Sequence, residues 1–281
     1  MKIILLALLL VVFPLFPQAT GAGEKNSPKK SEKDSKSTIT FAITPFDLTA
    51  EKLPENYAGH SILDIYQKLV IPKSKGEFEK SEEYEARLDR WKATPILGKI
   101  TPSDTLAFWV SELSAPDVLS LQYDADTEKL TANIAFGHYY GDTGDVRWLE
   151  MFYNSKSLGQ YMGITRMGVK FRVASHAASR IGIGVTESIE PISLSKDISR
   201  DEAVRIKPLL RVFAIVTLDE PYKLDGTKSV TASLDDPNEW LIKYRGLYVN
   251  LKAILIVNKK TGEIIARADA PFKRCDYGIC L

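Results

Sequence analysis

Apolar and polar residues alternate with a period of two at several places along the chain, a pattern that predicts β-strands with one face in water. The alternating segments are residues 39–44, 130–136 and 169–173. Two other segments, residues 209–218 and 247–257, are apolar at nearly every position. A continuous apolar run of this length is typical of central strands that are covered on both faces.

Turn residues divide some of these runs into hairpins. Residues 124–129 separate a strand-like segment at 119–123 from the strand at 130–136, and residues 258–263 separate the run at 247–257 from residues 264–268. Both linkers contain Asp or Asn together with Thr, which favours tight turns. Gly182 and Gly184 alternate with branched residues, which indicates a strand that a neighbouring segment approaches closely.

Helical patterns are fewer and shorter. Ser61 is a good N-cap for a segment with apolar residues on one face, and Pro72 follows its end. Residues 81–93 form a second amphipathic segment. Ser199 and Glu202 have the spacing of a capping box, in a helix that Pro208 ends. Many strands with few short helices predict an α+β fold in a single domain, built on a mostly antiparallel or mixed β-sheet.

The N-terminus has the layout of a secretory signal peptide. Lys2 precedes an apolar run at residues 3–12, and small residues follow at Ala19, Gly21 and Ala22, where a signal peptidase can cut. A retained membrane anchor is the alternative, but the apolar run is shorter than the roughly 20 residues that a spanning helix needs. We therefore expect residues 1–22 to be removed, leaving an exported, soluble protein without a transmembrane segment. The periplasm is the expected location, with the extracellular space as the alternative.

Residues 23–37 are rich in lysine and serine and lack aromatic side chains. Such a segment buries too little apolar surface to offset its chain entropy, so we expect a disordered linker. A polybasic contact with a membrane surface is the alternative, which the interleaved acidic residues weaken. Residues 38–281 then form the single globular domain.

The charge balance argues against nucleic acid as a partner. Removal of residues 1–22 takes away only Lys2 from 37 basic side chains, which leaves 36 basic against 36 acidic side chains. Proteins that neutralise many phosphates carry a basic surplus or a concentrated basic face, and here the two signs are interspersed. The sequence leaves the partner unassigned, with another envelope or secreted protein as the candidate.

One segment carries a resemblance to a known family. Residues 75–87 read Lys-Gly-Glu-Phe-Glu-Lys-Ser-Glu-Glu-Tyr-Glu-Ala-Arg. This run resembles a segment in a family of exported, periplasmic bacterial proteins without an established activity. Further short counterparts are residues 123–126, 161–163 and 261–262, although residues 164–167 depart from the family pattern before Gly168. The resemblance implies a shared fold and assigns no catalytic residue.

The most suggestive polar cluster is residues 138–145, which contain His138, Asp142 and Asp145. Asp142-Thr143-Gly144 is similar to the aspartic-protease signature, in which two carboxylates share a proton. A second copy of that signature is missing, and Asp145 stands where a small or hydroxyl residue is usual. A polar turn is the simpler interpretation. Asp142 and Asp145 are also weak candidates for a cation site, because calcium accepts irregular sets of oxygen ligands.

Other candidate chemistry is weaker. Asp124 and Asp126 flank a predicted turn, where paired acids are usually solvated. His60, His138 and His176 lack His or Cys partners at metal-ligand spacing. The chain contains neither a Gly-x-Ser-x-Gly nucleophile motif nor a complete phosphate-binding loop. The sequence therefore assigns no catalytic residue, metal or cofactor.

Cys275 and Cys280 enclose four residues near the C-terminus. In an oxidising compartment we expect them to form one local disulfide, worth about 2 kcal/mol in the chain-entropy model. A redox-active pair is the alternative, but such pairs usually have Cys-x-x-Cys spacing.

These observations favour an exported, non-enzymatic binding or accessory module of the cell envelope. Two alternatives remain open. One is a hydrolase with a site around His138, Asp142 and Asp145, and the other is an inhibitor or immunity-like partner of another secreted protein.

Overall fold

The computed structural model describes residues 39–110, 118–141, 144–185, 189–271, 275–276 and 279–280. For residues 139–141, 144–145, 275–276 and 279–280 it describes the backbone only. The segment Ile39–Leu281 forms one compact unit. The expected signal peptide at 1–22, with Ala19, Gly21 and Ala22, and the expected linker at 23–37 lie outside the described residues.

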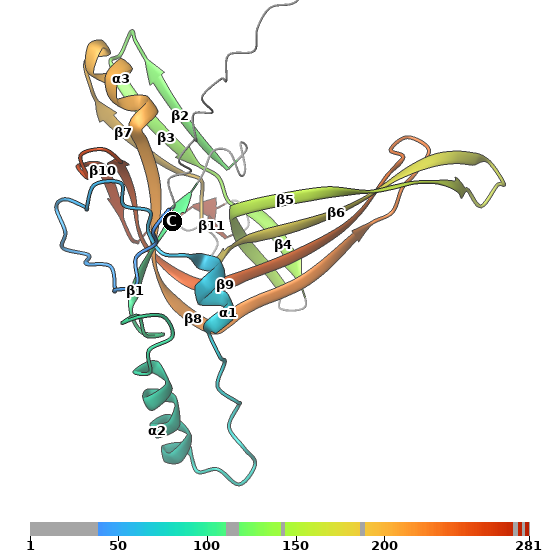
Figure 1. Ribbon diagram of the computed structural model, residues 1–281, viewed down its shortest axis with the longest axis horizontal. Coiled ribbons are helices and arrows are strands. Elements are labelled where there is room, and N and C mark those ends of the chain that lie inside the picture. Colours follow the sequence, from blue (N-terminus) through green and yellow to red (C-terminus); the bar gives the residue numbers. More distant parts are fainter. Residues whose placement is uncertain are drawn as a thin grey trace, which may run out of the picture. The chain divides into compact units, whose positions relative to one another are not determined.

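The described chain is mostly β-structure with three short α-helices, which confirms the expected α+β fold class (Figure 1). The helices are α1 (Ile62–Lys68), α2 (Ser81–Lys92) and α3 (Arg200–Ile206), the last continuing into a 3₁₀ turn at Lys207–Leu209. The first strands are β1 (Thr105–Val110), β2 (Leu119–Asp124), β3 (Lys129–Ile134), β4 (Gly137–Gly141), β5 (Gly144–Ile164) and β6 (Lys170–Val185). The others are β7 (Ile192–Asp197), β8 (Leu210–Val230), β9 (Asn238–Asn258), β10 (Ile264–Asp269), β11 (Cys275–Asp276) and β12 (Ile279–Cys280).

Seven strands form a mixed main sheet, in the order β1-β8-β9-β6-β5-β4 with β10 also paired to β9. The pairing of β6 with β9 is parallel, and the other pairings of this sheet are antiparallel. Strand β9 lies at the centre. Its first half lies between β8 and β6, and its second half lies between β8 and β10.

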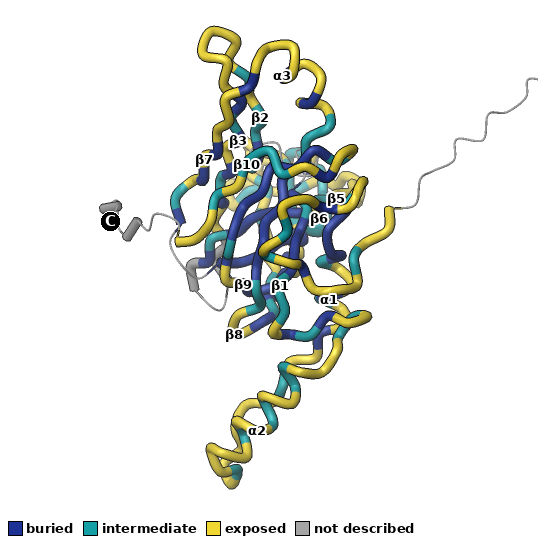
Figure 2. Tube along the Cα trace, turned by 90° about the vertical axis from the view of Figure 1, so that its left-hand side faces the viewer, coloured by how far each residue is buried: buried dark blue, intermediate teal, exposed yellow. Residues whose placement is uncertain are grey.

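The apolar run at residues 247–257 is buried on both faces, as its composition predicts. Leu247, Leu251 and Ile254 belong to the largest core cluster, whereas Leu255 and Val257 belong to a second cluster. Figure 2 shows this buried centre, while α2 is half-buried or exposed along its whole length.

Strands β2, β3 and β7 form a separate three-stranded antiparallel sheet. Helix α3 packs against it through a cluster of Leu130, Ile198, Ala203 and Ile206. The hairpin predicted at residues 124–129 is confirmed, because Asp124 pairs with Lys129. A carboxylate oxygen of Asp124 accepts a hydrogen bond from the backbone N–H of Asp126 at 2.9 Å, so this acid stabilises the turn.

The three predicted helices are present, with differences at their ends. Ser61 caps α1, because its Oγ accepts a hydrogen bond from the backbone N–H of Asp64 at 3.2 Å. Ser199 precedes α3 without making a side-chain capping bond. The capping box expected there is therefore not formed. In the described part of the chain, none of the helices is long and apolar enough to cross a membrane.

The prediction of a strand at residues 39–44 is wrong, because this segment has no regular strand pairing. It runs extended and makes isolated backbone hydrogen bonds, including one from Ala42 N–H to Gly59 O at 2.8 Å. Ile39, Phe41 and Ile43 remain partly exposed. Their alternation therefore does not reflect a buried sheet face, and two of these side chains line a pocket.

Candidate functional site

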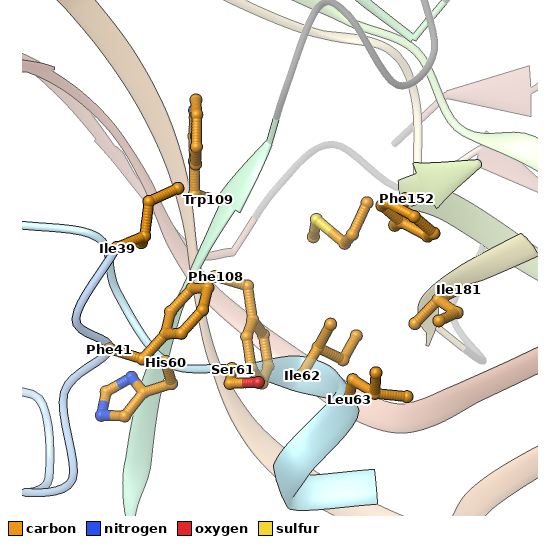
Figure 3. A pocket seen from close by; sticks show the side chains of 11 residues that line it. Ile39, Phe41, His60, Ser61, Ile62, Leu63, Phe108, Trp109, Phe152 and Ile181 are labelled. Atoms are coloured by element: carbon orange, nitrogen blue, oxygen red, sulfur yellow. The ribbon is translucent and has the colours of Figure 1, made fainter. Parts of the chain in front are cut away.

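A cavity of about 400 Å³ opens beside the N-terminal end of α1 (Figure 3). Eleven side chains from five parts of the chain line it. They are Ile39 and Phe41 from the extended segment, His60, Ser61, Ile62 and Leu63 around the start of α1, Phe108 and Trp109 from β1, and Met151, Phe152 and Ile181 from β5 and β6. Nine of the eleven are apolar, and none carries a permanent charge.

The extended segment is held in place by the backbone around it. Phe46 N–H donates to Thr105 O, and Lys99 N–H donates to Ile43 O, both at 2.8 Å. Gly59 has a positive φ of 72°, and a Cβ there would lie 2.6 Å from Ala107 O. This position requires glycine. It brings the chain close to β1 immediately before His60.

His60 joins three parts of the pocket wall. Its Nδ1 accepts a hydrogen bond from Ala107 N–H at 2.8 Å, and its Nε2–H donates to Thr44 O at 2.8 Å. Its backbone N–H also donates to Ala107 O. Burial lowers the pKa of His60 below its ordinary value, outweighing the backbone carbonyls of Thr44 and Ala107, which favour the protonated ring. The imidazole is therefore a neutral structural group.

Ser61 is the other polar residue of the lining, and it is also committed to the fold through its capping bond to Asp64 N–H. Its Oγ and the Nε2 of His60 bond to different backbone groups, so these neighbours do not form a nucleophile–base pair. The arrangement is suited to binding an uncharged apolar group, because the polar side-chain atoms of His60 and Ser61 already have partners.

A buried carboxylate, Glu150 of β5, lies outside the pocket lining. Burial raises the pKa of Glu150, and the charge of Arg180 opposes that shift. The two side chains approach to 3.3 Å, and the Arg180 guanidinium lies over the rings of Tyr153 and Tyr244. This pair does not line the cavity beside α1.

The polar cluster expected at residues 138–145 is only partly described. His138 lies exposed on β4, and Arg147 of β5 bonds to its Nε2. Asp142 and the side chain of Asp145 lie outside the described residues. The hydrolase and cation-site hypotheses therefore stay predictions.

Other sequence candidates are dispersed. His176 stacks on Trp240 with ring centroids 4.4 Å apart, far along the chain from His60 and His138. Among the described residues, no group of three or more His, Cys, Asp or Glu side chains is placed to hold a metal ion. Cys275 and Cys280 lie opposite each other in the β11–β12 backbone pairing, but their side chains lie outside the description. The disulfide stays a prediction.

The segment that carries the family resemblance stabilises itself. Arg87 donates two hydrogen bonds of 2.9 Å to the carboxylate of Glu79, which lower the pKa of Glu79 to about 2. Lys75 donates to Ser81 Oγ at 2.8 Å, and Arg87 also lies over the ring of Tyr84. Five of the ten charged and hydroxyl-bearing residues of the segment thus make side-chain contacts with one another, which indicates a structural role for these five.

No family model matches this chain, and comparisons with curated proteins and with solved structures also found no match. The resemblance at residues 75–87 therefore stays an expectation. The pocket was missed at the sequence level because its lining residues are spread from residue 39 to residue 181. The available signal was the apolar alternation at residues 39–44, which we interpreted as a strand.

Proposed function

We propose that this chain is an exported, non-enzymatic binding module of the cell envelope, and that its ligand is an uncharged apolar group such as an acyl chain. The observation that carries the proposal is the apolar pocket, whose two polar residues bond to the fold and whose lining has no permanent charge. Its volume of about 400 Å³ is within the range of small-molecule sites.

The proposed location rests on the signal-like pattern of residues 1–22. The cysteine pair near the C-terminus supports it, because a disulfide there would persist only in an oxidising compartment. A binding role also agrees with the arrangement of His60 and Ser61, which hold the pocket wall together instead of facing a reacting group.

The test is a titration of the purified mature protein with the neutral fluorescent probe N-phenyl-1-naphthylamine. We expect saturable binding that dodecanol displaces and that a dicarboxylate of the same length does not. Leu63→Asp places a charge on the pocket wall and should weaken probe binding about tenfold or more, because an apolar ligand would bury an unpaired carboxylate.

The matched control is Leu241→Asp on β9. Leu63 and Leu241 are exposed to a similar extent, 37% and 39%, but Leu241 lies outside the pocket lining. The control should bind the probe as the parent protein does, and circular dichroism should show that both variants are folded. Absence of saturable probe binding, or equal binding by the Leu63→Asp variant, would disprove the proposal.

A further inference from the structure

Strands β5 and β6 continue past the rest of the main sheet as a two-stranded arm, which we define as residues 161–173 (Figure 1). The parallel neighbour of β6, strand β9, begins at Asn238 opposite Ala174. Beyond this pair the hairpin has no third strand among the described residues. At about 3.3 Å per residue, its turn lies roughly 20 Å beyond the sheet.

The arm exposes apolar side chains mainly on one face and at its turn. Met162 and Ile164 pair across the hairpin with Arg172 and Lys170, so these four residues share one face. On the opposite face Tyr161 is 48% exposed, whereas Phe171 is half-buried and Val173 is buried. The exposed fractions rise toward the turn, reaching 64% at Ile164 and 94% at Met167.

The charge of this region differs from that of the chain as a whole. Residues 151–185 contain no aspartate or glutamate, although acidic and basic side chains are nearly equal in number over the full sequence. The arm itself carries three cations, Arg166, Lys170 and Arg172. Acidic residues reappear at its base, where Glu239 accepts hydrogen bonds from Tyr161 and Ser175 at 2.8 and 2.9 Å. Positive charge is therefore concentrated among the exposed apolar side chains.

We propose that the arm docks on a membrane surface that contains anionic lipids. Its apolar tip would enter the boundary between headgroups and acyl chains, while Arg166, Lys170 and Arg172 would contact the phosphates. The two most exposed apolar side chains of the arm, Ile164 and Met167, gather at the tip beside the three cations. This combination fits a membrane boundary, where an apolar layer lies directly below a layer of phosphates. The absence of acids removes the repulsion that an anionic surface would otherwise cause.

The turn is suited to a water-poor environment because its backbone groups bond to each other. Thr165 N–H donates to Val169 O, and Gly168 N–H donates to Thr165 O, both at 2.9 Å. Val169 N–H donates to the Thr165 side chain at 3.1 Å. The outer edges of a two-stranded arm still carry unpaired backbone groups, so insertion is limited to the tip and does not span the bilayer.

The experiment measures co-sedimentation of the mature protein with phosphatidylcholine vesicles and with vesicles containing 30% phosphatidylglycerol. We expect binding to the anionic vesicles that weakens as salt is added. Lys170→Gln combined with Arg172→Gln should reduce the affinity for anionic vesicles about tenfold or more, because each cation near an anionic surface contributes to the binding free energy. Ile164→Ser combined with Met167→Ser should reduce binding even at low salt, because the apolar contribution is lost.

Two controls match these variants. Lys196→Gln with Lys207→Gln removes two exposed cations away from the arm, and Val204→Ser removes an exposed apolar side chain from α3. Both should bind as the parent does. A variant with glutamine at all five lysines of residues 25–36 should retain arm-dependent binding. Loss of binding in that variant alone would overturn the proposal.

A depth measurement provides a second readout. Met167→Trp should give fluorescence that is quenched by lipids brominated in their acyl chains, whereas Val204→Trp should not. Equal binding by parent and arm variants would overturn the proposal, as would equal affinity for neutral and anionic vesicles. Arm-dependent capture of an acidic protein without vesicle binding would overturn it in favour of a protein partner. Leu63→Asp should leave vesicle binding unchanged, because it alters the pocket and not the arm. A failure of the pocket proposal can therefore be distinguished from a failure of the membrane proposal.

Discussion

At the scale of single residues, His60 uses both ring nitrogens to join backbone segments that do not pair as strands. Ala107 N–H and Thr44 O are both 2.8 Å from the ring, and the residue is 2% exposed. The sequence identified His60 only as a histidine without metal-ligand spacing. Its partners could not be predicted, because Thr44 and Ala107 approach it only after the extended segment has docked beside β1.

The buried neutral His60 predicts a pH-dependent free energy of unfolding. The unfolded chain takes up a proton at this histidine as the pH falls below about 6.5, whereas the folded chain resists protonation because burial lowers the pKa. Stability should therefore fall as the pH decreases through this range, by at most about 1.4 kcal/mol per pH unit for one proton. Urea denaturation between pH 5 and 8 measures it.

His60→Gln should lower stability at pH 8 by about 2 kcal/mol, since buried hydrogen bonds are lost, and should flatten the pH profile. His176→Gln is the control, because His176 lies half-buried at the edge of a different cluster. A profile that keeps its slope in the His60→Gln variant would show that another group causes the pH dependence.

At Gly182 a neighbouring strand approaches the backbone closely, as the sequence predicted. A Cβ there would lie 2.3 Å from Leu149 O and 2.7 Å from the Trp148 ring. Gly182→Ala should therefore destabilise the protein by about 2–4 kcal/mol, because backbone and a buried indole would both have to shift. Gly137→Ala, whose Cβ would have no atom nearer than 3.7 Å, should change stability by less than about 1 kcal/mol. Equal thermal stability of the two variants would contradict this packing.

At the scale of elements, the sequence predicted those with strong internal patterns. Helix α1 and the β2–β3 and β9–β10 hairpins were predicted from caps, turns and alternation, and all three are confirmed. The long strands were predicted only in part. Strand β8 continues beyond residue 218 through a polar stretch, and its partner β9 holds it there by backbone pairing. Such pairing leaves little trace in the composition.

Helix α2 makes few contacts with the rest of the folded unit. None of its residues is fully buried. Trp91 is its main anchor, because its indole N–H donates to Val70 O at 2.6 Å and its ring lies 4.7 Å from that of Tyr222. We expect Trp91→Ala to accelerate amide hydrogen exchange of residues 81–92 about tenfold or more. Without the Trp91 contacts, the free energy needed to open the helix locally is lower.

Amide hydrogen exchange within β9 should be the same as in the parent protein, because the contacts of Trp91 lie outside the buried centre of β9. The comparison variant is Tyr84→Ala, which removes a ring that contacts Arg87 within the same segment. If both variants accelerate exchange in α2 equally, Trp91 does not anchor the helix.

At the scale of the whole folded unit, the sequence predicted the fold class but not the pocket or the arm. The class follows from counting strands and helices. The pocket depends on β1 and β5 coming close in space although β8, β9 and β6 separate them in the sheet order, and no local pattern indicates this approach. The arm depends on where β9 begins relative to β6, which no property of residues 161–173 specifies.

The central place of β9 also affects the order in which this chain can fold. A polypeptide emerges with its N-terminus first, whether from the ribosome or through an export channel. Strand β6 can pair with β5 early, but its other edge stays open until Asn238 and the residues after it have emerged. The interval between the emergence of Lys170 and that of Asn258 is therefore when this chain most needs a chaperone to shield an unpaired strand.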